Sequence, residues 1–516
     1  MYRLGIDVGG TNTDAVIVDE NRNVVASAKA PTTEDVYGGI LAAMGSVLKS
    51  ADIDRAGIAQ AMLGTTHCTN AIVERKNLAQ IGILRIGAPA TLSIPPMVDW
   101  AEDLKATAGE AAVIGGGFEF DGKELAAFDK VAATAFFERC RLKGIESVAI
   151  SCVFSPVRDD HELEAARLAR EVMGSHTHLS LSGKIGSMGL IERENATILN
   201  AALHKVSRSF TEGFADSLIE HGVTGAEAYF SQNDGTLMNA ENAKKYPILT
   251  IACGPTNSIR GASYLSKLND AIVIDVGGTT TDIGVLQNGF PRESGIAVTI
   301  GGVRTNFRMP DVMSFGLGGG SIVREKGGEV SVGPDSVGYR ITEEALVFGG
   351  GTLTATDIAV RLGMADIGDA GKVAHISEGL ARKAMDRIVE MVEDNIDAMK
   401  VSNGDVDVVL VGGGSILLPE SLKGAGRIHR PQHFAVANAI GSAISKVSGT
   451  YEKLVSYDET PREEALETAK NEAIEMAVQS GAARSTVEII DVEDIPLQYH
   501  DGNTSRVKIK AAGELV

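Results

Sequence analysis

Two stretches of the chain share one pattern of apolar and polar positions. In "YRLGIDVGGTNTDAVIVDENRNVVASAKA", near the start, an apolar run ends at a Gly-Gly-Thr turn, and two further runs follow, separated by the polar turn "ENRN". In "DAIVIDVGGTTTDIGVLQNGFPRES", past the middle, the same order recurs with a turn at "QNG". Short apolar runs bounded by Gly and Asn turns are typical of β-strands. We therefore predict two three-stranded meanders of the same plan, each beginning one lobe.

The rest of the chain alternates between helical and strand-like patterns. Helical periodicity covers five segments, residues 34–51, 158–175, 191–222, 377–400 and 434–447. A strand–turn–helix is predicted at 60–76, a strand at 80–87, a helix and a strand within 129–155, and a strand with a glycine turn at 406–419. Alternation of this kind predicts α/β lobes with mixed sheets.

Two changes along the chain suggest domain boundaries. Long helices begin after a loop near residue 187, and beyond about residue 450 a charged helix (460–482) precedes two strand patterns (485–499 and 505–513). We predict an N-terminal lobe at 1–186, a second lobe at 187–450 and a C-terminal helix-and-strand element at 451–516.

Composition narrows the partners that the chain can have. The formal charge of −20 argues against nucleic acid and anionic membranes, which reward clustered Lys and Arg. Neither an N-terminal signal-peptide pattern nor an apolar run of about 18 residues occurs. The four cysteines form no CxxC pair, which fits free thiols in a reducing compartment. We predict a cytoplasmic protein.

The glycine turns carry the candidate chemistry. Backbone N–H groups of a Gly-Gly-Thr turn can point at an anion, and the absence of Cβ atoms lets phosphate oxygens approach. Gly9, Gly10, Thr11, Asn12 and Thr13 form the first such turn, and Gly277, Gly278, Thr279, Thr280 and Thr281 form the second. Two matching turns, one in each lobe, predict a triphosphate held from both sides.

Carboxylates flank both turns. Asp7 and Asp275 end buried strands, where an unpaired carboxylate is costly, and a hydrated Mg²⁺ is a natural partner. We expect them to orient the waters of Mg²⁺, or one of them to position the nucleophile. Asp14 and Asp282 are expected to cap the turns or to bond neighbouring amides.

Three further features are candidates for the same site. Gly412, Gly413, Gly414 and Ser415 form a third turn after an apolar strand, where a purine can lie against backbone; the alternative is an ordinary strand–helix turn. Glu192 is a candidate for orienting water, although a solvated helix start explains it equally well. His67, in "GTTHCTN", is placed to touch substrate or phosphate, or to bond the start of its own helix.

The motifs in this order resemble the actin-like ATPase superfold, which includes sugar kinases. Within it, "DVGGTNTD", "LGTTHCTNAIVERK", "IDVGGTTTDIGVL", "FGLGGGSIV", "LTATDIAVRLG" and "LVGGGSILLP" are similar to the hydantoinase A / 5-oxoprolinase family over nearly the whole chain. The resemblance implies a two-lobed, ribonuclease-H-like α/β fold with mixed sheets, a nucleotide cleft and a short C-terminal α+β element. It implies ATP and Mg²⁺ as cofactors.

The resemblance also implies an activity. Members that act on cyclic amides phosphorylate the amide oxygen of a hydantoin, 5-oxoproline or lactam, and water then opens the ring. We expect such a hydrolase, with catalytic roles for Asp7, Asp275 and Glu192, a second hydantoinase B-like subunit as partner, and an oligomeric assembly. The alternatives are the ATP-using subunit of an acetone-type carboxylase and a nucleotide-driven reactivase or chaperone-like factor. Met313 stands where longer members have a histidine, which leaves the substrate open.

Overall fold

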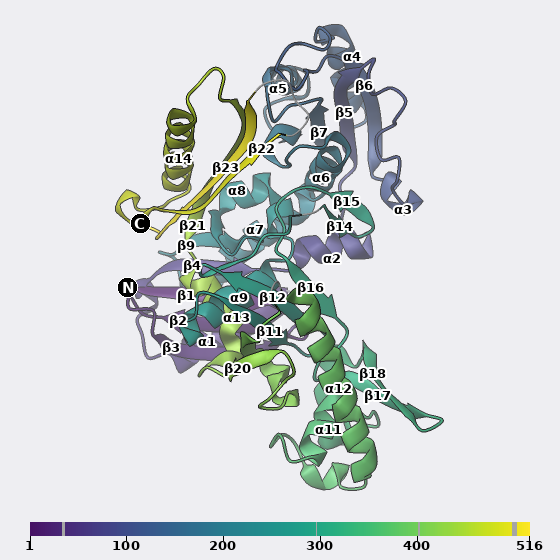
Figure 1. Ribbon diagram of the computed structural model, residues 1–516, viewed down its shortest axis with the longest axis vertical. Coiled ribbons are helices and arrows are strands. Elements are labelled where there is room, and N and C mark those ends of the chain that lie inside the picture. The colour runs from purple at the N-terminus through teal and green to yellow at the C-terminus, as the bar shows by residue number, and fades with distance from the viewer. Residues whose placement is uncertain (34–36, 296, 401–402, 498–502) are drawn as a thin grey trace.

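In the computed structural model, which describes residues 1–33, 37–295, 297–400, 403–497 and 503–516, both predicted meanders are present (Figure 1). The first consists of β1 (Tyr2–Val8), β2 (Asn12–Val18) and β3 (Val24–Pro31), and the second of β11 (Ala271–Val276), β12 (Thr281–Gln287) and β13 (Phe290–Pro291). Their registers match, because Asp7 pairs with Asp14 and Asp275 pairs with Asp282. The sequence repeat is therefore a structural repeat.

Each meander is extended by two parallel strands beside its first strand. The first lobe adds β4 (Ile58–Gly64) and β9 (Glu227–Ser231), and the second adds β19 (Val406–Val411) and β20 (Ala425–His429). Both sheets thus contain the strand order 3-2-1-4-5, counting each lobe's own strands along the chain. This mixed topology, found twice, confirms the predicted two-lobed α/β fold.

The first sheet continues beyond β9 to nine strands. The added strands, in spatial order, are β10 (Leu237–Asn239), β21 (Val447–Ser456), β23 (Thr504–Gly513) and β22 (Glu488–Pro496). Helix α14 (Arg462–Gln479) packs on β21 and β23 through buried Ala465, Ala469, Ala473 and Ala477. The last strands therefore extend the first lobe's sheet, seen in yellow in Figure 1. The predicted domain division stays a prediction; by sheet membership, residues 271–429 hold the second sheet.

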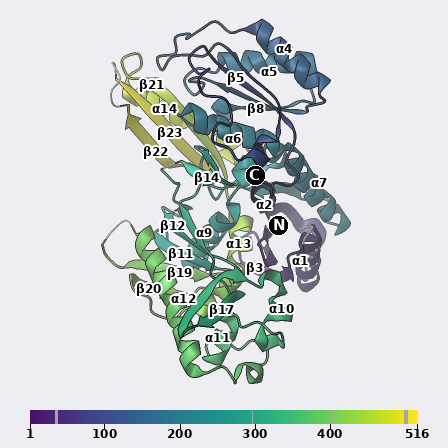
Figure 2. The ribbon, with the colours of Figure 1, turned by 90° about the vertical axis from the view of Figure 1, so that its right-hand side faces the viewer.

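A separate parallel sheet is inserted between β4 and β9. Its strands lie in the order β6 (Ala108–Gly115), β5 (Ile81–Ala88), β7 (Ser147–Cys152) and β8 (His178–Leu181). The helices of this part of the chain are α2 (His67–Glu74), α3 (Glu102–Lys105), α4 (Lys130–Leu142), α5 (Asp160–Met173), α6 (Leu190–Ala202) and α7 (His204–Glu220). The inserted sheet lies at the end of the molecule opposite α11 (Ala355–Arg361) and α12 (Glu378–Met399) in both views (Figures 1 and 2).

The second lobe carries additional hairpins. Strand β16 (Val312–Phe315) pairs with β12, and two hairpins are formed by β14 (Val298–Ile300) with β15 (Val303–Thr305) and by β17 (Ser321–Lys326) with β18 (Glu329–Ser336). Helix α10 (Ile341–Glu344) follows. The β14–β15 hairpin reaches the first lobe, where Arg75 donates to the Gly301 carbonyl oxygen at 2.8 Å and Asn195 donates to the Arg304 carbonyl oxygen at 3.0 Å.

Two helices cross between the two sheets. Helix α9 (Cys253–Ser266) follows the strands of the first sheet but packs on β11, β12 and β19, and α13 (Ala437–Ile444) follows β20 but packs on β1 and β2. The crossing is close, because a Cβ atom on Gly261 or Gly441 would overlap the backbone of the other helix. Helix α1 (Tyr37–Ser50) covers the outer face of the first meander. The exchange of helices ties the lobes together beside both glycine turns.

The apolar positions that define these elements are buried in six clusters, the largest of which lies under α1, α2 and α7. All four cysteines are buried free thiols, as predicted. Among the helices of the described residues, none has the length and apolar character needed to cross a membrane.

Candidate nucleotide site

The two glycine turns have the same backbone geometry. The Gly9 amide donates to the Asn12 carbonyl oxygen at 3.0 Å, and the Gly277 amide donates to the Thr280 carbonyl oxygen at 2.9 Å. Each turn closes a hairpin between paired strands, so the amides at its tip are not needed by the ladder. The amides at both tips are therefore available to a ligand.

The turns meet across the two lobes. A Cβ atom on Gly10 would lie 3.7 Å from Thr279 Oγ1, and one on Gly278 would overlap the side chain of Thr11. Thr11 Oγ1 is buried and has no hydrogen-bond partner among the residues that the structure describes. An orphaned hydroxyl between two turns is a donor without an acceptor, which is costly unless a ligand supplies one. The structure thus brings the two predicted phosphate turns into direct contact.

Adjacent residues of α9 hold the two predicted carboxylates. Asn257 Nδ2 donates to Asp7 Oδ1 at 2.7 Å, and Ser258 Oγ donates to Asp275 Oδ2. Helix α13 adds Asn438, whose Nδ2 lies 3.1 Å from Asp7 Oδ2. The sequence alone does not single out these three residues, because "CGPTNS" (253–258) contains the glycine and proline typical of a loop and Asn438 lies in the small-residue helix predicted at 434–447. One helix between the lobes therefore positions one carboxylate from each.

These carboxylates are short of positive charge. Burial, together with the nearby carboxylates of Asp14 and Asp275, raises the pKa of Asp7 to about 7. Burial also raises the pKa of Asp275. A divalent cation would relieve this cost. No group of three or more His, Cys, Asp or Glu side chains suited to a metal occurs in the described part of the chain. Two carboxylates with ligand oxygens and water are nevertheless a usual Mg²⁺ environment, so these residues fit the predicted ion.

The room for both carboxylates comes from equivalent glycines. Gly64 ends β4 beside β1, and Gly412 directly follows β19 beside β11. A Cβ atom on Gly64 would overlap Asp7 Oδ1, and one on Gly412 would overlap Asp275 Oδ1. The fourth strand of each lobe therefore ends in a residue without a side chain, at the point where the carboxylate needs the space.

The third glycine turn lies against the second. Gly412 to Ser415 begin a 3₁₀ turn at Gly413–Leu417, and a Cβ atom on Gly414 would lie 2.5 Å from the Gly277 carbonyl oxygen. From the other side, Gly319 and Gly320 donate to the carbonyl oxygens of Gly277 and Gly278 at 3.0 and 2.8 Å. The second phosphate turn is thus enclosed by glycine-rich backbone.

Asp14 and Asp282 do not cap the turns, the first of the roles expected for them, although Asp14 does bond an amide, that of the Asn438 side chain. Lys29 Nζ donates to Asp14 Oδ1 at 2.5 Å, and Ser314 Oγ donates to Asp282 Oδ1. The Asp14 and Asp282 side chains lie on the same sheet face as Asp7 and Asp275, because cross-strand partners in an antiparallel pair share a face. They therefore do not cap the turns. Burial raises the pKa of Asp282 to about 7.

Glu192, Cys253 and His67 lie outside the two glycine turns. Glu192, in the first turn of α6, forms an ion pair with Arg304 at 3.5 Å, and none of its described contacts reaches Asp7 or Asp275. Cys253 is buried beside Thr65, and burial raises the pKa of its thiol, which fits an inert residue. His67 begins α2, three residues after Gly64.

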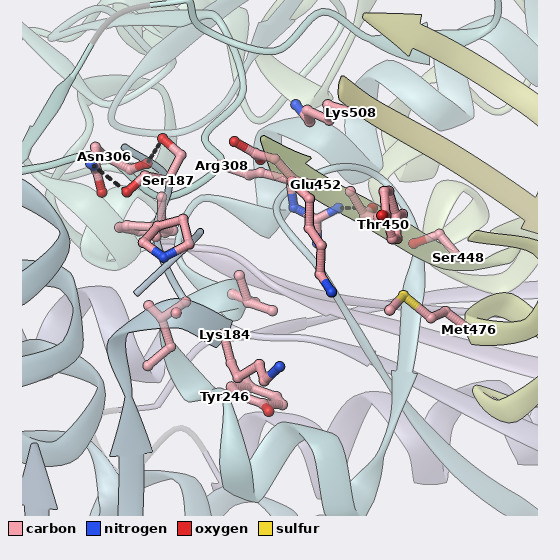
Figure 3. Close-up of a pocket in the computed structure, with 18 of the residues that line it drawn as sticks. Lys184, Ser187, Tyr246, Asn306, Arg308, Ser448, Thr450, Glu452, Met476 and Lys508 are labelled. Carbon is pink, nitrogen blue, oxygen red and sulfur yellow. Dashed lines mark hydrogen bonds between the residues drawn. The ribbon is translucent and has the colours of Figure 1, made fainter. Parts of the chain in front are cut away.

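A large cavity of about 1360 Å³ lies elsewhere, and Glu192 lines it. Its walls come from the loop at 183–189, α8 (Ala240–Lys245), β21 and α14. Figure 3 shows Arg308 beside Thr450, to whose Oγ1 it donates at 2.7 Å. None of the glycine-turn residues lines this cavity. It is therefore distinct from the candidate nucleotide site.

Comparison with known protein families identifies the chain. Residues 3–173 match the hydantoinase/oxoprolinase N-terminal region, and residues 193–369 match hydantoinase/oxoprolinase. The chain belongs to the hydantoinase/oxoprolinase family. The resemblance found in the sequence is confirmed, and the matched segments contain both phosphate turns.

Individual relatives in this family differ in their activities. Caprolactamase subunit alpha of Pseudomonas jessenii is 27% identical over 483 residues, which are 88% of this chain and 67% of that protein. The acetophenone carboxylase gamma subunit of Aromatoleum aromaticum is 24% identical over 404 residues, 70% of this chain and 53% of that protein. The 5-oxoprolinase of Saccharomyces cerevisiae is 30% identical over 225 residues, 43% of this chain and 17% of that protein. The chain thus spans between 17% and 67% of these relatives.

Two solved structures share the fold. The ATP-dependent caprolactamase from Pseudomonas jessenii has a TM-score of 0.77 at 21% identity, and nucleotide-free acetone carboxylase has a TM-score of 0.69 at 17% identity. Both similarities cover 100% of this chain and 88% of the other.

Proposed function

We propose that the chain is the ATP-using part of an enzyme that hydrolyses a cyclic amide of the hydantoin, 5-oxoproline or lactam type. One observation carries this proposal: two glycine turns of the same backbone geometry, one from each lobe, meet at their tips, each with a carboxylate from the preceding strand. The arrangement suits a triphosphate, because phosphoryl transfer depends mainly on positioning and neutralisation of charge.

Each part of the site has a proposed role. The amides of Gly9–Thr13 and Gly277–Thr281 bind phosphate oxygens, and Gly412–Ser415 hold the adenosine. Asp7 and Asp275 hold Mg²⁺ through water, and that ion neutralises phosphate charge when it is bound. Asn257 and Ser258 keep the two carboxylates at a fixed separation when the lobes close on the nucleotide.

The proposed reaction has two stages. The amide oxygen of the ring attacks the γ-phosphorus, the bond to the β-phosphate oxygen breaks, and ADP leaves. Water then adds to the activated carbon, and the ring C–N bond breaks with proton transfer to nitrogen, which leaves an acyl phosphate. A second water hydrolyses the acyl phosphate, so that the carboxylate and inorganic phosphate are released. Glu192 as the residue that orients water remains a prediction that its pairing with Arg304 does not favour.

A carboxylase subunit is the second candidate. The match to the acetophenone carboxylase gamma subunit over 70% of this chain favours it, and the phosphate turns would serve that chemistry equally well. In both cases we propose a second large subunit as partner, because two relatives that match 88% and 70% of this chain are named as subunits.

One experiment separates these candidates. ADP release is measured with hydantoin, 5-oxoproline, caprolactam and acetone with bicarbonate, with and without co-purifying proteins. Stimulation by the cyclic amides supports the hydrolase, and stimulation by the ketone with bicarbonate supports the carboxylase. Stimulation by a protein alone would replace both with a nucleotide-driven reactivase.

A further inference from the structure

The repeat of the fold extends beyond the hairpins to the segments after the fourth strands. In the second lobe, β19 ends at Val411, and Gly412–Ser415 follow beside Asp275. In the first lobe, β4 ends at Gly64 beside Asp7, and Thr65–His67 follow. Thr65–His67 therefore occupy the position in the first lobe that the proposed adenosine turn occupies in the second. Two equivalent positions face the two ends of one triphosphate.

The first-lobe segment is fixed beside Asp7. The Thr65 amide lies 3.4 Å from Cys253 Sγ, which in turn lies 3.4 Å from the Thr65 carbonyl oxygen, so the segment is bound to the start of α9. At the same helix start, a Cβ atom on Gly254 would lie 4.0 Å from Asp7 Oδ2. Asn257, fully buried in α9, has a side-chain oxygen for which the described part of the chain provides no hydrogen-bond partner. The region beside Asp7 thus contains polar capacity that the protein does not use.

His67 can present one hydrogen-bond donor, its ring Nε2–H, to a ligand beside this segment. Burial lowers its pKa to about 4, so the imidazole is neutral near pH 7. The His67 amide donates to Thr65 Oγ1 at 3.2 Å, and the same hydroxyl contacts Nδ1 of the ring. The hydroxyl can accept from the amide with one lone pair and donate its proton to Nδ1, an arrangement that places the ring proton on Nε2. Nε2 has no partner among the described residues, and the side chain is partly exposed.

We propose that Gly64–His67 form the acceptor subsite and that His67 Nε2–H selects substrates with a second oxygen besides the amide oxygen that is phosphorylated. This inference rests on the proposed function. A neutral donor suits a ring carbonyl or a carboxylate that does not react, whereas a donor to the attacking oxygen would weaken it as a nucleophile. 5-Oxoproline and hydantoin carry such a second oxygen, and simple lactams do not.

Two matched pairs of compounds test the inference. 5-Oxoproline is compared with 2-pyrrolidinone, and hydantoin with 2-imidazolidinone, because each pair shares a ring and differs in the second oxygen. We expect kcat/KM for ADP release to favour the first member of each pair by about tenfold or more, since a site built to donate a hydrogen bond rejects the analogue that lacks the acceptor. His67→Phe should reduce this preference to within about threefold and leave KM for ATP unchanged. His67→Asn keeps an N–H donor and should restore part of the preference.

Other results overturn the inference. An unchanged preference in His67→Phe would show that His67 does not contact the substrate. Equal loss for both members, with a raised KM for ATP, would place the residue on the nucleotide side. If no cyclic amide stimulates the wild type, the proposed function fails. The location of the subsite is then tested by ATP hydrolysis without substrate, in which water accepts the phosphoryl group. A change of about fivefold or more in this rate in His67→Phe supports the location, and an unchanged rate contradicts it. Thermal unfolding of each variant checks its fold.

Discussion

The two hairpins have the same backbone but different surroundings. In the first, Asp7 and Asp14 are each 3% exposed and are contacted by Asn257 and Lys29. In the second, the equivalent carboxylates are less deeply buried, and the side-chain hydrogen bonds that the described residues give them come from the hydroxyl groups of Ser258 and Ser314. Glycine-rich backbone encloses the second turn on two sides, whereas the first is followed by a segment with hydroxyl, imidazole and thiol groups.

The difference indicates that the two lobes of the repeated fold have different roles in the proposed site. A backbone that binds phosphate is useful in both lobes, so its register is the same. The side chains differ because one lobe faces the adenosine end of the proposed nucleotide and the other faces the γ-phosphate and the acceptor. Charge and hydrogen-bond donors are concentrated in the first lobe, where transfer is proposed to occur.

Removal of either strand-end carboxylate should have the largest effect. Asp7→Asn and Asp275→Asn keep the side-chain volume and one accepted hydrogen bond each but remove the charge; at position 7 one of the two bonds, from Asn257 or Asn438, is also lost. We expect ATP turnover to fall roughly 100-fold or more in each, comparable to the loss of one preorganised electrostatic group. The fall should be greater for Asp7, which is nearer the acceptor subsite. Steady-state ADP release measures both, and wild-type rates in either variant would contradict a two-sided clamp.

Because the two turns are in contact, glycine-to-alanine substitutions at Gly278 and at Gly10 should have unequal effects on KM for ATP. Gly278→Ala places a methyl group against Thr11, and we expect KM for ATP to rise about tenfold as the lobes are forced apart, because overpacking costs about 1–3 kcal/mol. Gly10→Ala is the matched control, since its methyl group would have 3.7 Å to the nearest atom. Equal effects of the two substitutions would mean that the turns do not approach each other in solution.

Lys29 should matter more than its structural equivalent. Lys29→Met leaves the buried Asp14 carboxylate without the partly exposed cation that it pairs with, and we expect kcat/KM for ATP to fall about fivefold, since a buried carboxylate without a cation is costly. Ser314→Ala removes only a hydroxyl from Asp282 and should change it less than about twofold. Thermal unfolding separates loss of stability from loss of function. A larger effect of Ser314→Ala than of Lys29→Met would contradict the proposal that transfer occurs beside the first lobe.

The smallest effect concerns stability and pH. The folded-state pKa of Asp282, about 7, lies above its unfolded value near 3.9, so the folded state holds the proton more tightly. Stability therefore falls as pH rises from about 4 to 7. Asp282→Asn removes this pH-dependent loss of stability. Relative to the wild type, we expect its free energy of unfolding to be higher by an amount that grows over that pH range and reaches roughly 1–2 kcal/mol above pH 7, after allowance for solvent screening. Asp14→Asn should gain less, because Lys29 stabilises that charge. Denaturant unfolding at pH 5 and pH 8 tests both.

The sequence was sufficient for the hairpins and the third glycine turn, because strand periodicity and glycine position are local properties. It was not sufficient for Asn257 and Ser258. Their stretch contains Gly254 and Pro255, which suggest a loop, but proline is tolerated in the first turn of a helix, and α9 begins at Cys253. Their bonds to Asp7 and Asp275 depend on the crossing of α9 and α13 between the sheets. The pairing of Asp14 with Lys29 likewise depends on strand register, which the spacing alone does not define.

The central claim is that one nucleotide is held by both turns at once. The most direct measurement is a crystal structure of the chain with Mg²⁺ and a non-hydrolysable ATP analogue. We predict phosphate oxygens within hydrogen-bond distance of amides in both Gly9–Thr13 and Gly277–Thr281, with the adenine at Gly412–Ser415. A nucleotide bound by one turn only, or bound in the cavity beside Arg308, would contradict the account.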